Sequence, residues 1–220
     1  MAVALIPARM GSQRLKKKNM QPFCGMPLIE YAIFRCKEAG VFEHIVVNSE
    51  DMEFAAIAKR NNVEFYHRDP ELANNLATSE EFIADFFSNS THENIFQVHS
   101  ITPLLSPEKI REFVEFSLNS DHDTVLSNVD DRIEVSYQDV PVNFSYHEKT
   151  NSQDLLPTQR ITWSITYWTR EVFLEAHRDR GCGTYSGNIG YYSVPLYSGM
   201  AIKTMVDLQV AQVLKDHNVV

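Results

Sequence analysis

Cysteine is scarce in this 220-residue chain, which contains only Cys24, Cys36 and Cys182. An odd number without a Cys-x-x-Cys pair disfavours a disulfide framework and a zinc knuckle, and it indicates a reducing compartment such as the cytoplasm. Glycine and proline are also few, at 8 and 9 residues, which excludes collagen-like and low-complexity chains. A chain of this length buries about 70% of its unfolded surface, so we expect one folded domain, residues 1–220, without a structural metal.

Positive charge is in short supply as well, because 20 Lys and Arg stand against 29 Asp and Glu, a formal net charge of −9. A general nucleic-acid binder needs a broad basic surface, so any bound anion must lie at a local basic site. Long apolar runs are also missing: no stretch approaches the roughly 18 residues of a membrane span, and the apolar start is too short for a signal peptide. We expect a soluble, unprocessed cytoplasmic protein with no nucleic-acid or membrane partner.

Strand-like and helix-like patterns alternate along the chain. Short apolar runs predict strands at 2–7, 44–48, 63–66, 94–99, 123–129, 161–168 and 188–194. Amphipathic spacing and capping residues predict helices at 28–39, 49–60, 78–89, 106–118, 170–178 and 204–216. Strands joined by helices favour right-handed crossovers and a parallel sheet that is covered on both faces. The pattern therefore predicts a three-layer α/β sandwich with a mainly parallel sheet.

An insertion interrupts this alternation at about 132–150. Two segments of alternating apolar and polar residues, 132–137 and 141–146, flank Gln138-Asp139-Val140 and predict a β-hairpin. An isolated hairpin is marginally stable in water, and two strands alone cannot bury its Val, Phe and Tyr side chains. The hairpin is therefore expected either to fold onto the sheet or to pair with another subunit.

The loop after the first predicted strand carries the strongest chemical signal. Five cations fall within ten residues, at Arg9, Arg14, Lys16, Lys17 and Lys18. The backbone N–H groups of a Gly-Ser turn lie among them, and ligands of open α/β sheets bind where strands end. The loop therefore predicts a polyphosphate site, with a solvated basic loop as the alternative. It matches neither the Walker pattern GxxxxGK[ST] nor the dinucleotide pattern GxGxxG.

The stretch PARMGSxRxxxKN resembles the signature of the sugar-activating cytidylyltransferases, the CMP-sialic acid synthetase-like family. Further segments resemble the family in the same order: CGMPLIEYAI, HIVVNSED, HRDPELA, VHSITPLLS and TMVDLQVA. The resemblance implies a Rossmann-like nucleotidyltransferase fold, CTP as donor, a 2-keto sugar acid as acceptor, pyrophosphate release and a homodimer assembled through the inserted hairpin. We predict an enzyme that transfers CMP from CTP to a sialic- or nonulosonic-acid-like sugar.

The family pattern also implies roles in nucleotide binding. The residues it assigns there are Ala8, Arg9, Gly11, Ser12, Lys18, Asn19, Arg68, Ala77 and Ser79. Arg9 and Lys18 form the predicted catalytic pair: Lys18 would offset charge on the leaving pyrophosphate, and Arg9 would orient the α-phosphate for in-line attack. Asn19 would lie near the base and ribose.

The loop that contains Arg68, Ala77 and Ser79 resembles the one that recognises cytosine in the family. Two structural alternatives stay open for these side chains. Arg68 could form a surface ion pair with Asp69 or Glu71, and Ser79 could cap a helix. The capping role and the nucleotide-binding role of Ser79 are compatible.

The family's metal ligands are missing, because its D-x-D-T aspartates correspond to Ala201 and Lys203. Asp207 has capping-box spacing from Thr204 and is expected to be structural. Lys203 could supply fixed positive charge, with Mg²⁺ carried mainly by the phosphates of the nucleotide. One alternative is a non-catalytic nucleotide-binding protein descended from the family, and another is an enzyme that uses a different nucleotide or acceptor.

The acceptor site is predicted from polar residues, most of them at 151–165, where the family carries its sugar-acid loop. The predicted acceptor-binding residues are His99, Gln153, Gln159, Arg160 and Lys203. Their polar groups suit hydroxyls and a carboxylate. Trp163 or Trp168 could offer an apolar face to a pyranose, but the alternation of TWSITYW favours a place in the core for both.

Overall fold

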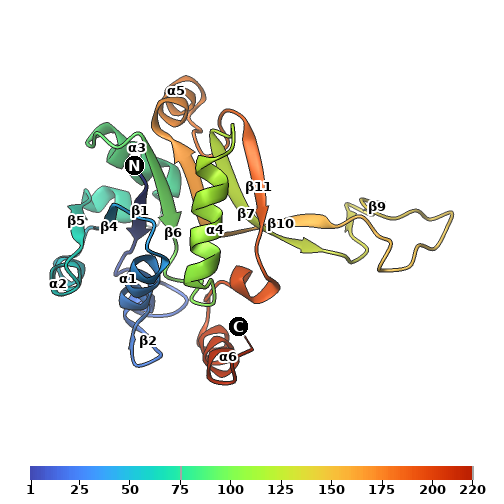
Figure 1. Ribbon diagram of the computed structural model, residues 1–220, viewed down its shortest axis with the longest axis horizontal. Coiled ribbons are helices and arrows are strands. Elements are labelled where there is room, and N and C mark those ends of the chain that lie inside the picture. The colour runs from blue at the N-terminus through green and yellow to red at the C-terminus, as the bar shows by residue number, and fades with distance from the viewer. Residues whose placement is uncertain (75, 220) are drawn as a thin grey trace.

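The computed structural model describes residues 1–74 and 76–219. At its centre lies a seven-stranded sheet with the order β11-β7-β10-β6-β1-β4-β5 (Figure 1). The strands are β1 (Val3–Pro7), β4 (His44–Ser49), β5 (Glu64–His67), β6 (Asn94–Val98), β7 (Thr124–Asp131), β10 (Thr158–Thr169) and β11 (Ile189–Ser193). Only β10 is antiparallel to its neighbours, β6 and β7. The prediction of a mainly parallel sheet is confirmed.

Helices cover both faces of the sheet, as the alternation predicted. Helices α1 (Leu28–Ala39), α2 (Met52–Arg60) and α4 (Pro107–Leu118) pack on one face, and α3 (Ser79–Ser88) and α5 (Arg170–Arg180) on the other. Successive side chains of a strand point to opposite faces; accordingly, Ala4 and Ile6 join the first core cluster, and Val3 and Leu5 join the second. Helix α6 (Met205–Asp216) packs against a third cluster. The three-layer sandwich is confirmed.

Capping side chains set the starts of several helices. Asp51 caps α2 and Ser106 caps α4 by accepting hydrogen bonds from backbone N–H groups. Thr204 and Asp207 form a capping box at α6, so the structural role predicted for Asp207 is confirmed. At α3 the cap is Thr78, which shares a capping box with Glu81. The predicted capping role of Ser79 is therefore wrong by one residue, since Ser79 is the first residue of the helix.

Strand β10 contains an irregularity that separates the two tryptophans. Its register with β7 shifts between Ile161 and Thr166, and Trp163 within this stretch has a positive φ of 58°. Trp168 is 1% exposed, as expected for a core residue. Trp163 is only partly buried, and its ring lies against that of Tyr185. The irregularity thus leaves Trp163 at the margin of the core.

The inserted hairpin forms an arm, which we define as residues 132–157. Its strands β8 (Ser136–Tyr137) and β9 (Val140–Pro141) pair antiparallel around Gln138 and Asp139, both at positive φ. The arm projects away from the body of the molecule (Figure 1), so the alternative in which it folds onto the sheet is wrong. Its exposed apolar side chains are Ile133, Tyr137, Val140, Val142, Tyr146 and Leu156.

Three short 3₁₀ helices and a small hairpin complete the described fold. The 3₁₀ helices are η1 (Lys18–Met20), η2 (Pro70–Ala73) and η3 (Leu196–Gly199), and the hairpin pairs β2 (Pro22–Phe23) with β3 (Met26–Pro27). Within residues 1–74 and 76–219, no helix is long and apolar enough to cross a membrane.

Candidate active site

A cavity of about 320 Å³ opens at the carboxyl ends of β1, β5 and β6. The basic loop after β1, the loops after β5 and β6, and the start of α3 form its walls. The predicted nucleotide-binding residues that line it are Ala8, Arg9, Ser12, Lys18, Asn19, Arg68, Ala77 and Ser79. Gly11 lies in the same basic loop but outside the lining. Segments far apart in the sequence thus bring nearly the whole predicted set to one cavity.

The cavity wall carries positive charge, and the carboxylates that interact with it, Glu50 and Asp207, lie outside the lining. Arg9, Arg14, Lys18 and Arg68 belong to its walls, and among the described lining residues none is Asp or Glu. Burial lowers the pKa of the Lys18 ammonium, and the positive charges of Arg14, Arg9 and Lys203 lower it further. Like charges held together in this way favour an anionic ligand, because a bound anion removes their mutual repulsion.

Lys18 also links the cavity to the segment that precedes α6. Its Nζ donates a hydrogen bond to the carbonyl oxygen of Ile202, at 3.1 Å, and the N–H of Ile202 donates to the carbonyl oxygen of Ile101, at 2.7 Å. Lys203 follows directly and lies close enough to affect the pKa of Lys18. It is itself exposed and outside the cavity lining. Its charge therefore acts at the edge of the cavity.

The lowered pKa of Lys18 predicts how CTP affinity depends on pH. Below its pKa the ammonium is charged and attracts a triphosphate; above it the amine is neutral. Because the pKa lies below the ordinary 10.5, we expect affinity to decline on raising the pH before an ordinary lysine would lose its proton. Calorimetric titrations of CTP from pH 7 upward test this. Lys18→Arg should move the decline to higher pH, since guanidinium stays charged; pH-independent affinity in the wild type would contradict the prediction.

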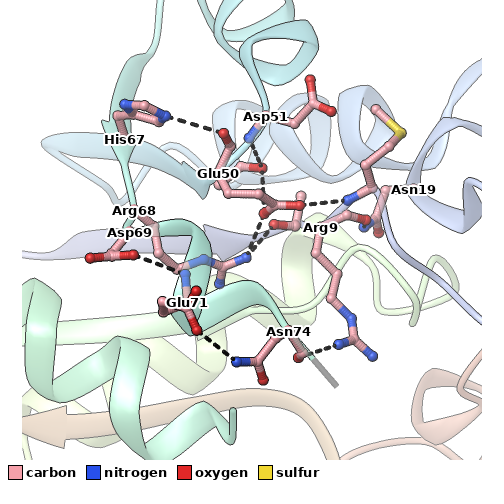
Figure 2. Close-up of polar contacts among 12 residues, drawn as sticks. Arg9, Asn19, Glu50, Asp51, His67, Arg68, Asp69, Glu71 and Asn74 are labelled. Atoms are coloured by element: carbon pink, nitrogen blue, oxygen red, sulfur yellow. Dashed lines mark hydrogen bonds and ion pairs between the residues drawn. The ribbon is translucent and has the colours of Figure 1, made fainter. Parts of the chain in front are cut away.

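Asn19 anchors the basic loop from within. The side chain is 5% exposed; Nδ2 donates to the carbonyl oxygen of Arg9, at 3.1 Å, and Oδ1 accepts from Ser100 Oγ, at 2.7 Å. The guanidinium of Arg9 extends to the carbonyl oxygen of Asn74, at 2.9 Å (Figure 2). Asn19 thus lines the cavity, while both polar ends of its side chain bond within the protein.

Arg68 is buried rather than on the surface, with 3% exposure. Its Nη2 donates to the carbonyl oxygen of Ala8, at 2.8 Å, and to Glu50 Oε2, at 3.0 Å (Figure 2). The guanidinium lies 4.9 Å from the centre of the Phe82 ring. The alternative of a surface ion pair with Asp69 or Glu71 is therefore wrong. Burial would raise the pKa of Glu50, but the hydrogen bonds it accepts, from Met10 N–H and Arg68 among others, hold it below its ordinary value.

The predicted acceptor residues are divided between two places. His99 lines the cavity, where burial and the charge of Lys18 lower its pKa to about 4. The imidazole is therefore neutral near pH 7 and offers hydrogen bonds rather than charge. Gln153, Gln159 and Arg160 are exposed and lie outside the cavity lining. Arg160 pairs with Asp131 at the base of the arm, with 2.7 Å between Nε and Oδ2.

The cavity does not fit a divalent metal held by the protein. Across the described residues, no group of three or more His, Cys, Asp or Glu side chains could hold an ion. Mg²⁺ prefers carboxylate and phosphate oxygens, whereas the charged residues of the cavity wall are cations. The nearby Asp207 carboxylate accepts hydrogen bonds from Lys203 N–H and from the Thr204 N–H and hydroxyl.

Sequence reasoning missed two charged residues that shape the site, Arg35, which is buried, and Glu50, which is partly buried. Arg35 in α1 is 1% exposed and donates to the carbonyl oxygens of His99, Thr102 and Leu105 in the loop after β6. Its place beside the apolar positions 32 and 36 on one helix face is a signal that could have found it. The sequence around Glu50 contains no comparable signal, since an acidic residue is common just before a helix.

Solved structures share this fold. The chain resembles a CMP:2-keto-3-deoxy-manno-octonic acid synthetase complexed with CTP, with a TM-score of 0.72, 14% identity and 99% of each chain covered. It also resembles the 4-diphosphocytidyl-2C-methyl-D-erythritol synthase of Anaerococcus prevotii, with a TM-score of 0.68, 10% identity and 98% of each chain covered. The chain therefore has the same fold as these two synthases.

Sequence comparison shows the family to which the chain belongs. The sequence pattern of the family described as Cytidylyltransferase matches residues 3–212, and the chain belongs to this family. It is 23% identical over 225 residues to the pseudaminic acid cytidylyltransferase of Campylobacter jejuni serotype O:23/36, covering 96% of this chain and 95% of that relative. It is 32% identical over 128 residues to the N-acylneuraminate cytidylyltransferase of Streptococcus agalactiae serotype III, covering 57% and 31%. The family predicted from the sequence is confirmed.

Proposed function

We propose that this protein transfers CMP from CTP to a nonulosonic acid and releases pyrophosphate. The observation that carries the proposal is the cavity at the carboxyl end of β1, where Arg9, Arg14 and Lys18 line the wall and no described lining residue is Asp or Glu. The names of its relatives, pseudaminic acid and N-acylneuraminate cytidylyltransferase, support an acidic nine-carbon sugar as the acceptor class.

The proposed reaction is an in-line displacement at the α-phosphorus of CTP. A hydroxyl oxygen of the sugar acid forms the new bond to phosphorus, its proton passes to solvent, and the bond between the α-phosphorus and the bridging oxygen breaks. Pyrophosphate leaves with that oxygen. Lys18, partly buried and poorly solvated, stabilises the charge that develops on the leaving group, and Arg9 orients the phosphates. In this proposal neutral His99 donates a hydrogen bond to the acceptor or accepts one from it, without adding charge.

In this proposal Mg²⁺ arrives on the nucleotide, and its chemistry is to shield phosphate charge. The carboxylate-free wall supports this source over a protein-held ion. Lys203, close to Lys18, adds fixed positive charge at the same edge.

Donor choice tests the first half of the proposal. Each of the four ribonucleoside triphosphates is mixed with the protein and Mg²⁺, and the unfolding temperature is recorded. At a concentration a hundredfold above its dissociation constant, CTP should stabilise the fold by about 2.7 kcal/mol. The other three nucleotides, at the same concentration as CTP, should stabilise it less. Equal stabilisation by all four, or none, would contradict CTP as the donor.

Pyrophosphate release tests the second half. We expect release when CTP is combined with pseudaminic acid or an N-acylneuraminic acid. One rival is a nucleotide-binding protein without catalysis, which Ala201 and Lys203 at the positions of the family's aspartates support. CTP binding without pyrophosphate release from either sugar acid would favour that rival.

We also propose a homodimer assembled through the arm, because its exposed apolar side chains would be covered by a second copy. Sedimentation at micromolar concentration should give twice the chain mass. Substituting Val140 and Val142 (63% and 58% exposed) with Asp should give a monomer. Met52→Asp is the matched control, since Met52 is 62% exposed but lies on α2, and it should leave the dimer intact. A monomeric wild type would refute the proposal.

A further inference from the structure

An ion pair between a buried arginine and a partly buried glutamate lies directly beside the basic loop. Glu50 follows β4 and Arg68 follows β5, and their side chains are 17% and 3% exposed, with 3.0 Å between Glu50 Oε2 and Arg68 Nη2. Neither residue comes from the loop that carries the cations. The pair therefore supports this loop from two neighbouring strands.

The pair holds the backbone on both sides of Arg9. Glu50 Oε1 accepts a hydrogen bond from Met10 N–H, at 3.0 Å, and Arg68 Nη2 donates to the carbonyl oxygen of Ala8, at 2.8 Å. Figure 2 shows Glu50 and Arg68 joined to each other, with Arg9 between them and Asn19. Both peptide neighbours of Arg9 are thus fixed by one pair of opposite charges.

Each charge in the pair depends on the other. The guanidinium also lies against the Phe82 ring, and its Nε is buried with no hydrogen-bond partner among the described residues. A buried cation that loses its carboxylate is strongly unfavourable. Neutralising Glu50 would therefore disturb Arg68 and, through it, the carbonyl group of Ala8, in addition to weakening the bond to Met10.

We propose that Glu50 is a positioning residue for the triphosphate: through Met10 N–H and Arg68, its carboxylate fixes the backbone around Arg9 before the nucleotide binds. Glu50 itself does not touch the nucleotide in this account. The proposal rests on the proposed function and adds to it a residue outside the cavity wall. Preorganised groups bind more tightly because less ordering remains to be done on binding.

The chain offers a matched control in the ion pair of Glu30 and Arg60. Glu30 is 19% exposed and accepts from Arg60 at 2.6 and 3.0 Å. This pair joins α1 to the end of α2 and does not line the cavity. Glu30→Gln therefore neutralises a carboxylate of similar exposure that also pairs with an arginine, although Arg60 itself is 51% exposed, and it leaves the loop untouched.

The test compares Glu50→Gln with Glu30→Gln by calorimetric titration of CTP in the presence of Mg²⁺. Both variants are expected to unfold at a lower temperature than the wild type. Only Glu50→Gln should raise the dissociation constant for CTP, by about tenfold, as expected when a phosphate-binding group is slightly misplaced. An unchanged constant in Glu50→Gln, or an equal rise in Glu30→Gln, would overturn the proposal.

A second measurement on the wild type covers the case in which Glu50→Gln does not fold. Hydrogen exchange of the Met10 amide in CTP-free protein should be slowed at least about tenfold relative to an unstructured peptide, since the proposed hydrogen bond exists before CTP arrives. Exchange at the peptide rate would overturn the proposal. If the wild type does not bind CTP, the proposed function fails, and the exchange of this amide still decides whether Glu50 holds the loop.

Discussion

Lys18→Met is expected to lower the rate of pyrophosphate release by about 10²- to 10³-fold, the usual loss when one preorganised charge is removed from a reacting centre. The same variant should unfold at the same temperature as the wild type or higher. Burial and three neighbouring cations lower the pKa of Lys18, which means that its charge is unfavourable in the free protein. Methionine removes that cost and still fills the space, which offsets the loss of the hydrogen bond from Lys18 Nζ to the Ile202 carbonyl oxygen.

Steady-state pyrophosphate release with CTP and a nonulosonic acid, together with thermal unfolding, checks this prediction. Lys16→Met is the control, because Lys16 lies in the same loop, is exposed and does not line the cavity. Its rate should match that of the wild type. Equal rates in Lys18→Met and Lys16→Met would contradict the prediction that the charge of Lys18 contributes to catalysis.

Arg35→Met is expected to destabilise the fold by about 1–3 kcal/mol, the cost of leaving a buried carbonyl oxygen without its donor. The guanidinium, 1% exposed, donates to the carbonyl oxygens of His99, Thr102 and Leu105. The carbonyls of His99 and Thr102 keep a donor within the loop, the Thr102 hydroxyl and the Leu105 N–H respectively, so the main cost falls on the Leu105 carbonyl. Because the same loop carries His99 to the cavity, CTP turnover should fall as well.

Urea unfolding measures the first effect. Arg111→Met is the control, since Arg111 also donates to a carbonyl oxygen, that of Ala39 at 2.9 Å, but is exposed on α4. Its cost should stay within about 1 kcal/mol. Equal costs for the two substitutions would contradict the role given to burial at Arg35.

Local patterns were enough to predict most of the fold. Helix α1 has the predicted bounds, 28–39, because its apolar spacing and the following Gly40 are both local signals. The antiparallel direction of β10 could not be read in this way. The direction of a strand depends on which distant strands it pairs with. The residues 158–169 alone do not indicate that β6 and β7 are the neighbours of β10.

In the candidate site, too, local features could be predicted from the sequence and long-range contacts could not. The basic loop could be predicted from its charge and turn residues within a short stretch, and its Arg9, Arg14 and Lys18 line the cavity. The roles of Glu50 and Arg35 were not predicted, because each bonds to backbone groups far away in the sequence. Composition and spacing do not reveal such contacts. Thr78 rather than Ser79 caps α3, a one-residue error typical of neighbouring cap candidates.

A crystal structure of the protein soaked with CTP and Mg²⁺ tests the central claim most directly. The account predicts triphosphate oxygens within hydrogen-bond distance of Lys18 Nζ, between Arg9 and Arg14, with the base near Ala77 and Ser79. Nucleotide bound elsewhere, or a cavity that stays empty at saturating CTP with these cations facing solvent, would contradict it.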